Sequence, residues 1–392
     1  MRALVTADTA GGVWTYAIDL ARGLAEREVE VVLAVMGPPL ADAQRNRVAR
    51  TPGVKIFDGA FRLEWMDQPW DDVDRAGRWL VGLAERFAPD VVHLNTFAHG
   101  ALDFGVPRLV VGHSCVCSWW RAVHGTEPPG EWDEYRRRVR AGLQAAERVA
   151  APTRAMLDEL AAFYGPLPPS RVIWNGRQAD LFAPRAKEPL VFSAGRLWDE
   201  AKNLAALEAA APLLPWPVYV AGATRRPDGP GEDVHFEHAH PVGTLSTRAM
   251  AAWFGRAAIY ALPARYEPFG LSVLEAALSG CALVLGDVSS LREVWDGAAR
   301  FVPPGDSRAL AAAITELAED AEGREELAAD STRRARELSA DRMAEGYLDL
   351  YREMSGHRDA APAESPANTP AIAGSTPPES SGGPDPVAAI AV

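Results

Sequence analysis

The residues with the clearest potential for chemistry are two glutamates, Glu267 and Glu275, separated by seven residues. Pro268 restricts the backbone after the first glutamate, and Gly270 gives the loop conformational freedom just before a helix-forming run. A loop that leads into a helix can direct two carboxylates and the unpaired amides of the first helical turn into one space. Carboxylates in such a place accept hydrogen bonds from sugar and ribose hydroxyls. The alternative interpretation is one solvated glutamate in a loop and another on a helix surface.

Two cations form a second candidate binding site. Arg196 and Lys202 lie between an apolar, β-rich run and an expected helix over residues 203–211. Fixed positive charges and the amide dipoles of a helix start reinforce each other, so this arrangement is a natural receptor for a diphosphate. The alternative interpretation is a pair of surface cations neutralised by Asp199 and Glu200.

Two further loops follow expected strands. Gly11 and Gly12 come after the first strand, where paired glycines let backbone amides approach an anion, although a simple change of chain direction also explains them. They are not part of a Gly-x-Gly-x-x-Gly motif, and no acidic residue ends the second strand to bind the ribose of a nicotinamide cofactor. His113 ends another expected strand, and its alternative interpretation is a histidine that caps the loop.

The elements that must position these loops alternate along the chain. Short apolar runs alternate with helix-forming stretches, which is typical of parallel strands buried on both faces. The first series of expected strands covers residues 3–6, 29–36, 54–58, 91–95, 108–113, 148–151 and 172–175. The second series covers residues 190–194, 217–221, 234–237, 259–263, 282–286 and 300–302. The expected fold class is therefore α/β, with two Rossmann-like, doubly wound parallel-sheet domains that face each other across an interdomain cleft.

The domain boundaries follow from the linker. Residues 182–188 contain the proline and charges of a linker, so we expect an N-terminal domain over residues 1–183 and a C-terminal domain over residues 184–342. A helix over residues 343–354 either stays with the second domain or packs back on the first. Residues 356–392 are rich in Pro, Ala, Ser and Gly without an apolar period, which predicts a disordered tail.

Composition excludes several classes of protein. The 392 residues are 48% hydrophobic and 24% charged, which supplies two buried cores and excludes wholesale disorder. A formal charge of −13 disfavours nucleic acid as a partner. No apolar run approaches the ~20 residues of a membrane span, and residues 1–8 have the pattern of a strand rather than a signal peptide, so we expect a cytoplasmic protein. Cys115, Cys117 and Cys281 are too few for a disulfide framework and are expected to be reduced.

Four motifs occur together along the chain. In chain order they are Gly11-Gly12, the run Val172-Ile173-Trp174-Asn175-Gly176 with Asp180, Phe182 and Pro184, Gly195-Arg196-Leu197 with Lys202, and Glu267-Pro268-Phe269-Gly270 with Glu275. Together they resemble the retaining glycosyltransferases of family 4, which are two-domain GT-B enzymes that use nucleotide-sugar donors. The resemblance extends over roughly residues 1–354.

The resemblance implies a role for each matching residue. Glu267 would hold hydroxyls of the transferred hexose, and Glu275 would hold the ribose. Arg196 and Lys202 would bind the diphosphate and neutralise the charge that develops as the glycosidic bond breaks. The remaining donor-binding residues would be Gly11, Gly12, Phe269, Gly270 and Leu271. His113 would face the donor sugar near the acceptor, and no carboxylate nucleophile would be required. Many relatives have one residue fewer between the arginine and the lysine, so the reach of Lys202 is where this sequence departs from the pattern.

Other residues carry weaker signals. Asp72-Val73-Asp74 has the spacing of a metal-binding motif, but we expect it to cap a helix. We expect no metal site at the histidines His235, His238 and His240, which lack acidic or thiol partners. The cationic face of one expected helix, formed by Arg136, Arg137, Arg138 and Arg140, is interpreted as solvated or, alternatively, as a contact with an anionic membrane. Trp119 and Trp120 either stack on an acceptor sugar or pack in the core.

The sequence therefore predicts a retaining glycosyltransferase that needs neither a metal nor another cofactor. Its donor would be a nucleoside-diphosphate hexose of the UDP-glucose or GDP-mannose type. Its acceptor would be a hydroxyl of a glycan, a lipid-linked molecule or a small molecule, with peripheral membrane contact as an option. Two alternatives are a non-catalytic nucleotide-sugar-binding or scaffolding subunit and a GT-B nucleotide-sugar epimerase. The first is disfavoured by the joint presence of both cations and both glutamates, and the second by the Glu267–Glu275 loop.

Overall fold

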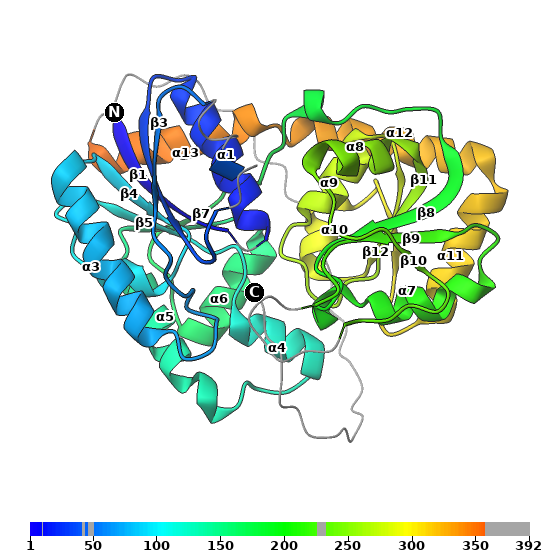
Figure 1. The fold of residues 1–392 in the computed structure, drawn as a ribbon, viewed down its shortest axis with the longest axis horizontal. Coiled ribbons are helices and arrows are strands. Elements are labelled where there is room, and N and C mark those ends of the chain that lie inside the picture. The colour runs from blue at the N-terminus through cyan, green and yellow to red at the C-terminus, as the bar shows by residue number, and fades with distance from the viewer. Residues whose placement is uncertain (10, 41–43, 46–50, 226–232, 357–392) are drawn as a thin grey trace.

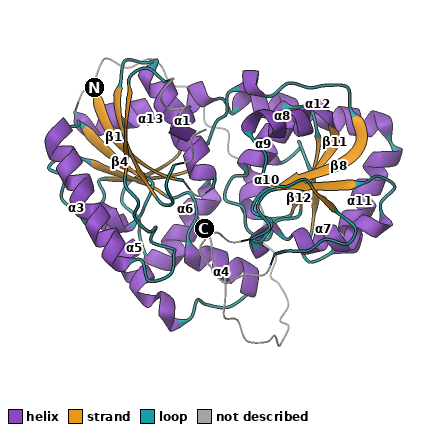
Figure 2. Ribbon diagram, viewed as in Figure 1, coloured by secondary structure: helices purple, strands orange, loops and turns teal. Residues whose placement is uncertain are grey.

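The computed structural model describes residues 1–9, 11–40, 44–45, 51–225 and 233–356. The predicted tail lies outside the described residues except for Gly356. Two parallel sheets lie side by side, and helices cover both faces of each sheet (Figure 1, Figure 2). Within the described part of the chain, no helix has the length and apolar character needed to span a membrane.

The N-terminal sheet has the strand order β3-β2-β1-β4-β5-β6-β7, with parallel pairing throughout. Its strands are β1 (Arg2–Asp8), β2 (Glu30–Met36), β3 (Val54–Asp58), β4 (Val91–Leu94), β5 (Arg108–Val111), β6 (Arg148–Ala151) and β7 (Ser170–Val172). Leu4 and Val32 belong to the hydrophobic cluster on one face, and Val5 and Leu33 to the cluster on the other. Burial of both faces explains why these strands are continuous apolar runs in the sequence.

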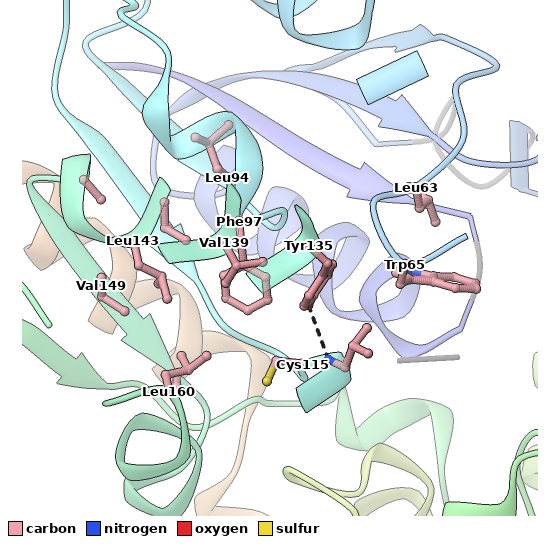
Figure 3. Packing of buried hydrophobic residues seen from close by; sticks show 14 of the residues in the cluster. Leu63, Trp65, Leu94, Phe97, Cys115, Tyr135, Val139, Leu143, Val149 and Leu160 are labelled. Atoms are coloured by element: carbon pink, nitrogen blue, oxygen red, sulfur yellow. Dashed lines mark hydrogen bonds between the residues drawn. The ribbon is translucent and has the colours of Figure 1, made fainter. Parts of the chain in front are cut away.

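Within the described residues of the N-terminal domain, five α-helices connect the strands of this sheet. They are α1 (Gly12–Ala25), α3 (Trp70–Phe87), α4 (Val116–His124), α5 (Asp133–Ala145) and α6 (Arg154–Tyr164). Figure 3 shows a contact that fixes α4: Tyr135 of α5 lies beside Val139 and Phe97, and its hydroxyl accepts a hydrogen bond of 3.3 Å from the backbone N–H of Val116. The start of α4 is therefore held against α5. This matters because α4 carries a tryptophan that reaches the other domain.

The C-terminal sheet has the order β10-β9-β8-β11-β12-β13, again parallel. Its strands are β8 (Glu188–Ala194), β9 (Val218–Ala221), β10 (His240–Pro241), β11 (Ala257–Leu262), β12 (Ala282–Gly286) and β13 (Arg300–Val302). Its helices are α7 (Leu204–Ala210), α8 (Thr247–Arg256), α9 (Leu271–Leu278), α10 (Ser289–Trp295), α11 (Ser307–Glu319) and α12 (Ala321–Glu337). Phe192 and Tyr260 face one hydrophobic cluster, whereas Val191 and Ile259 face the other.

The chain crosses between the domains twice. The first crossing follows β7, and the second joins α12 to α13 (Ala340–Ser355). The two crossings meet where Arg177 pairs with Ser339 as an isolated parallel bridge. Beyond this bridge α13 packs on α1 (Figure 1), where a Cβ on Gly23 would lie only 2.6 Å from the Cβ of Ala344. Of the two positions left open for the last helix, the structure adopts the one on the N-terminal domain.

One expected strand is wrong. Residues 234–237 form no strand, and the edge strand is β10 instead. The carboxylate of Glu208 accepts the backbone N–H groups of Glu237, His238 and Ala239 at 2.8, 2.8 and 2.9 Å. These amides therefore bind a side chain, and the chain reaches the sheet only after this turn.

Candidate active site between the domains

A cavity of about 340 Å³ lies between the two domains, beyond the carboxyl ends of β1, β5, β8 and β11. It is lined by all ten predicted site residues, namely Gly11, Gly12, His113, Arg196, Lys202, Glu267, Phe269, Gly270, Leu271 and Glu275. A larger groove of about 1050 Å³ between α1, the first crossing and α8 contains none of them. Parallel sheets place loops from the ends of different strands at one edge, which explains how residues far apart in sequence meet here.

Glu267 is fixed by contacts on both of its carboxylate oxygens. Oε2 accepts a hydrogen bond of 2.7 Å from Nζ of Lys202, and Oε1 accepts the backbone N–H of Gly270 at 2.9 Å. The hydroxyl of Ser290 donates to the backbone carbonyl of Glu267 at 2.5 Å. The longer loop thus still lets Lys202 reach the glutamate loop. The pair presents a positive and a negative group side by side at the start of α9.

Arg196 is oriented by a carboxylate that the sequence motifs did not identify as functional. Nε and Nη2 of Arg196 lie 3.3 and 2.8 Å from Oδ2 of Asp199. Asp199 is only 2% exposed, and its other oxygen accepts the indole N–H of Trp119 at 3.0 Å. Burial by itself raises the pKa of the Asp199 carboxyl, but the charges of Arg196 and Lys202 outweigh this and lower it. Asp199 is therefore an ionised, buried anchor beside the cavity.

Glu275 faces the first interdomain crossing. Its Oε1 accepts a hydrogen bond of 2.8 Å from Nε of Arg177, whose guanidinium also pairs with Asp19 of α1. The side chain of Arg177 is 1% exposed and also lies over the ring of Phe182. Arg177 lies at the hinge, which is the place where the two chain crossings meet. Its buried ion pairs connect the hinge to both domains. Its place directly after the Asn-Gly pair was the only sequence signal for this role.

The glycine turn after β1 faces the cation loop across the cavity. Gly11 has a φ of 103°, in the region that favours glycine, and precedes the first turn of α1. A Cβ placed on Gly11 would lie 3.1 Å from Nη1 of Arg196, and a Cβ on Gly12 would lie 3.4 Å from Leu271. The close approach of the two domains at this point leaves room for backbone but little for a side chain.

His113 is held by a chain of polar groups. Its Nε2 lies 2.8 Å from Oδ1 of Asn95, which also lies 3.1 Å from Nε2 of His93. Nδ1 of His93 lies 2.6 Å from the hydroxyl of Tyr351 on α13. Because the amide nitrogen of Asn95 donates to the carbonyl of Thr6, its oxygen is the acceptor for both rings. Burial, followed by the neighbouring His93, lowers the pKa of His113 to about 3, so its ring is neutral at pH 7.

Asn175, a member of the matched motif, also lies in the cavity wall. It is 5% exposed, and its Oδ1 has no hydrogen-bond partner among the described residues. A buried amide oxygen that faces a polar cavity is suited to accept a hydrogen bond from a ligand.

The structure corrects one weaker sequence interpretation and decides between the two alternatives left open for another. Helix α3 begins at Trp70, so Asp72 lies in its first turn rather than ahead of it, where it accepts the backbone N–H of Arg62 at 3.0 Å. Trp119 and Trp120 are 1% and 6% exposed and therefore do not offer their faces to an acceptor sugar. Both rings pack in the protein interior, and the indole N–H of Trp119 contacts Asp199 beside the cavity.

The remaining secondary signals have plain structural roles. On α5, Arg136 pairs with Asp133, Arg137 with Glu134, and Arg138 with Asp74 and Glu134. These acidic partners offset the cationic charge of this face. The three cysteines are free, as predicted, and all are buried.

Comparison with known proteins identifies the family. Residues 10–181 match the family model described as Glycosyltransferase Family 4, and residues 188–320 match the model described as Glycosyl transferases group 1. The chain belongs to the family 4 glycosyltransferases. Its two parallel-sheet domains have the GT-B fold, and it is a transferase enzyme of this family 4 type.

The similarity to family 4 and GT-B proteins extends over most of the chain. The chain is 27% identical to a D-inositol 3-phosphate glycosyltransferase of Xylanimonas cellulosilytica, over 90% of this chain and 94% of the relative. The solved sucrose-phosphate synthase of Thermosynechococcus elongatus superposes with a TM-score of 0.74 at 20% identity, over 91% of this chain and 99% of that one. HepE of Anabaena, solved with UDP-glucose, has a TM-score of 0.69 at 17% identity, over 90% of this chain and 100% of HepE.

Proposed function

We propose that this enzyme transfers a hexose, with retention of configuration, from a nucleoside-diphosphate sugar of the UDP-glucose or GDP-mannose type to an acceptor hydroxyl. The observation that carries the proposal is the meeting of two cations, Arg196 and Lys202, with two carboxylates, Glu267 and Glu275, in one interdomain cavity. A diphosphate requires the cations, whereas hexose and ribose hydroxyls require the carboxylates. The UDP-glucose bound to HepE supports the same donor class.

The donor would lie across the cavity in a definite direction. The ribose would lie at Glu275, the diphosphate between Arg196 and the Gly11 turn, and the hexose at Glu267. The backbone amides at the start of α9 and the side chain of Lys202 would surround the diphosphate on the C-terminal side. The orphaned oxygen of Asn175 would accept a donor hydroxyl. The side chains of Lys202, Glu267 and Glu275 are 14%, 13% and 14% exposed, so water would screen their interaction with the donor only in part.

Catalysis would use stabilisation of charge rather than a protein nucleophile. As the bond from the anomeric carbon to the diphosphate oxygen breaks, its electron pair moves to the diphosphate, where Arg196 and Lys202 stabilise the negative charge. The acceptor oxygen bonds to the anomeric carbon on the same face, and its proton passes to the leaving phosphate oxygen. The neutral ring of His113 would position the hexose and acceptor. Glu267 pairs with Lys202 and is not the base.

The acceptor would bind on the N-terminal side of the cavity, near His113. The relationship to a D-inositol 3-phosphate glycosyltransferase and the fold shared with a sucrose-phosphate synthase support a polyol or sugar hydroxyl as one acceptor class. Lipid-linked and glycan acceptors remain further candidates, as does a peripheral membrane contact at the cytoplasmic face.

Thermal unfolding of the purified protein with UDP-, GDP-, ADP- and dTDP-sugars tests the donor site. A ligand that binds only the folded state raises the melting temperature by mass action. We expect a shift with one nucleotide family, and its loss in Arg196→Ala. A matched control is Arg300→Ala, which removes an exposed arginine paired with Glu316 far from the cavity. A protein that responds to no nucleotide sugar would contradict the proposal.

We also propose that no metal ion takes part, because Arg196 and Lys202 supply positive charge where the diphosphate would lie. Cleavage of the donor should proceed equally with and without EDTA. A tenfold loss that Mg²⁺ or Mn²⁺ restores would overturn this. Incubation with the donor alone also tests the epimerase alternative, since an epimerase would convert the donor without an acceptor.

A further inference from the structure

Asp199 is a point at which the two domains meet beside the cavity. Its Oδ1 accepts the indole N–H of Trp119, which comes from α4 of the N-terminal domain, and the backbone N–H of Ala201, both at 3.0 Å. Its Oδ2 accepts hydrogen bonds from Arg196. A single buried carboxylate therefore connects a side chain of one domain to the cation expected at the diphosphate in the other.

The guanidinium nitrogens of Arg196 face two different sides. Asp199 takes Nε and Nη2, so this edge of the plane is fixed. Nη1 points toward the glycine turn across the cavity, within 3.1 Å of a Cβ placed on Gly11. Because a guanidinium is planar, fixing one edge also fixes the direction of the remaining nitrogen. The orientation of Arg196 toward a donor therefore depends on how firmly Asp199 is held.

The position of the Asp199 carboxylate depends in turn on a contact from the N-terminal domain. Two of its contacts, to Ala201 and Arg196, come from its own loop and persist whatever the domains do. The contact with Trp119 comes from α4 and exists only while the two domains are close together. Tyr266, next to Glu267, joins the same helix start, since its hydroxyl accepts the backbone N–H of Cys115 at 3.2 Å. Closure of the cleft thus acts on the cation loop and on the glutamate loop at once.

We propose that Trp119 and Asp199 are positioning residues that couple the orientation of Arg196 to the closed arrangement of the domains. The inference rests on the proposed function, because it takes Arg196 to bind the donor diphosphate. In the open arrangement Asp199 lacks the indole donor, Arg196 is held less firmly, and the glycosidic bond is not activated. Closure supplies this hydrogen bond, so the glycosidic bond is activated only in the closed arrangement, whether the acceptor oxygen comes from a sugar or from water.

Trp119→Phe tests the coupling, because it keeps an aromatic ring and removes the N–H. Two quantities are measured: the dissociation constants of UDP and GDP by calorimetry, and the rate at which UDP-glucose or GDP-mannose is cleaved without an acceptor. In that reaction water replaces the acceptor and gives free hexose, nucleoside diphosphate and a proton. We expect the cleavage rate to fall at least tenfold while the dissociation constant changes less than threefold, because the nucleoside diphosphate binds the C-terminal domain without closure.

Trp120→Phe is the matched control. Trp120 is the next residue on α4, it is also buried, and its N–H donates to Thr126 at 3.1 Å rather than into the cavity. We expect its cleavage rate and dissociation constants to stay within twofold of the wild type. Equal cleavage rates for Trp119→Phe and Trp120→Phe would overturn the inference.

Asp199→Asn gives a second test that does not depend on the tryptophan variant. An asparagine keeps an acceptor for Trp119 and Ala201 but removes the charge that holds Arg196. We expect tighter binding of UDP or GDP, because the positive charge is no longer shared, together with slower cleavage. A merely structural role would weaken both together. The double variant that combines Trp119→Phe with Asp199→Asn should lose no more cleavage rate than the more impaired of the two single variants. Losses that multiply would contradict the coupling.

The two proposals fail in different ways. A wild-type protein that binds neither UDP nor GDP and cleaves neither sugar contradicts the proposed function. A wild-type protein that does both, with variants that behave like Trp120→Phe, contradicts the coupling alone.

Discussion

The ammonium group of Lys202 lies 2.7 Å from a carboxylate oxygen of Glu267, and both side chains are largely shielded from water. The two groups were expected to bind different parts of the donor, the diphosphate and the hexose. Their direct contact means that each neutralises the other before a donor arrives. The expected diphosphate site and the expected hexose site therefore adjoin at this contact, near which the glycosidic oxygen would lie.

Glu267→Gln tests whether this carboxylate acts on the hexose rather than on the nucleotide. The amide keeps the shape and an acceptor for the N–H of Gly270 but loses the charge. We expect kcat for donor cleavage to fall about 10- to 100-fold, the worth of a hydrogen bond to a charged group. Calorimetry should give nearly unchanged binding of the nucleoside diphosphate. Glu316→Gln, on an exposed pair with Arg300, is the control. A large loss of nucleotide binding would assign Glu267 to the diphosphate instead.

Tyr351 should influence the ring of His113 from the last helix. Because the Asn95 oxygen accepts from Nε2 of both rings, Nδ1 of His93 is the acceptor for the Tyr351 hydroxyl, which stabilises the same tautomer. Tyr351→Phe should therefore redistribute the histidine tautomers and cost about 1 kcal/mol of stability. Nitrogen chemical shifts of the imidazole rings report the tautomers directly. Tyr347→Phe is the matched control, since this buried hydroxyl one turn earlier interacts with the hydroxyl of Tyr16 rather than with a histidine nitrogen. Unchanged shifts in Tyr351→Phe would disprove the relay.

Stability should fall as the pH is lowered from 7.5 to 5.5. Burial lowers the pKa values of His93 and His113 to about 3, whereas both rings titrate near 6.5 in the unfolded chain. Above pH 6.5 both histidine rings are largely neutral in the folded and the unfolded protein, so they do not make the free energy of unfolding depend on pH. Below it the unfolded chain takes up protons that the folded protein refuses, which costs about 1 kcal/mol per histidine at pH 5.5. Urea unfolding at the two pH values measures the difference, and His113→Asn should reduce it. A pH-independent free energy of unfolding in this range would contradict the assignment.

Arg177 should be critical for stability. Arg177→Met removes the charge that Asp19 and Glu275 face and leaves carboxylates in a buried site, which we expect to cost about 3–5 kcal/mol. Urea unfolding measures the loss, and adding Asp19→Asn should recover part of it. Arg22→Met is the control on the same side of the hinge, because its pair with Glu26 is exposed and worth less than about 1 kcal/mol. Similar losses in both variants would show that Arg177 is not a special case.

Local sequence patterns predict most strands of this protein and the residues of its candidate site. Of the thirteen strands that the structure describes, twelve overlap a predicted apolar run, because a parallel strand buried on both faces needs such a run. The exception was β10, where the amides bind the side chain of Glu208, a partner that no local pattern identifies. The run predicted over 172–175 shares only Val172 with β7. The ten site residues were predicted from motif types, their spacing and the resemblance to family 4, and the structure gathers them around one cavity. Their chemical roles stay predictions.

The partners of those residues were decided by the tertiary structure alone. Asp199 looked like a surface counter-ion of Arg196, yet it is buried under Trp119, a residue 80 positions away. Arg177 drew no attention, yet it links α1 and α9 at the hinge. Motif spacing determines which groups leave the end of one strand, because strand and loop lengths are local. Which carboxylate holds which cation depends on how the two domains pack, and that packing is the sum of contacts between segments far apart in the chain.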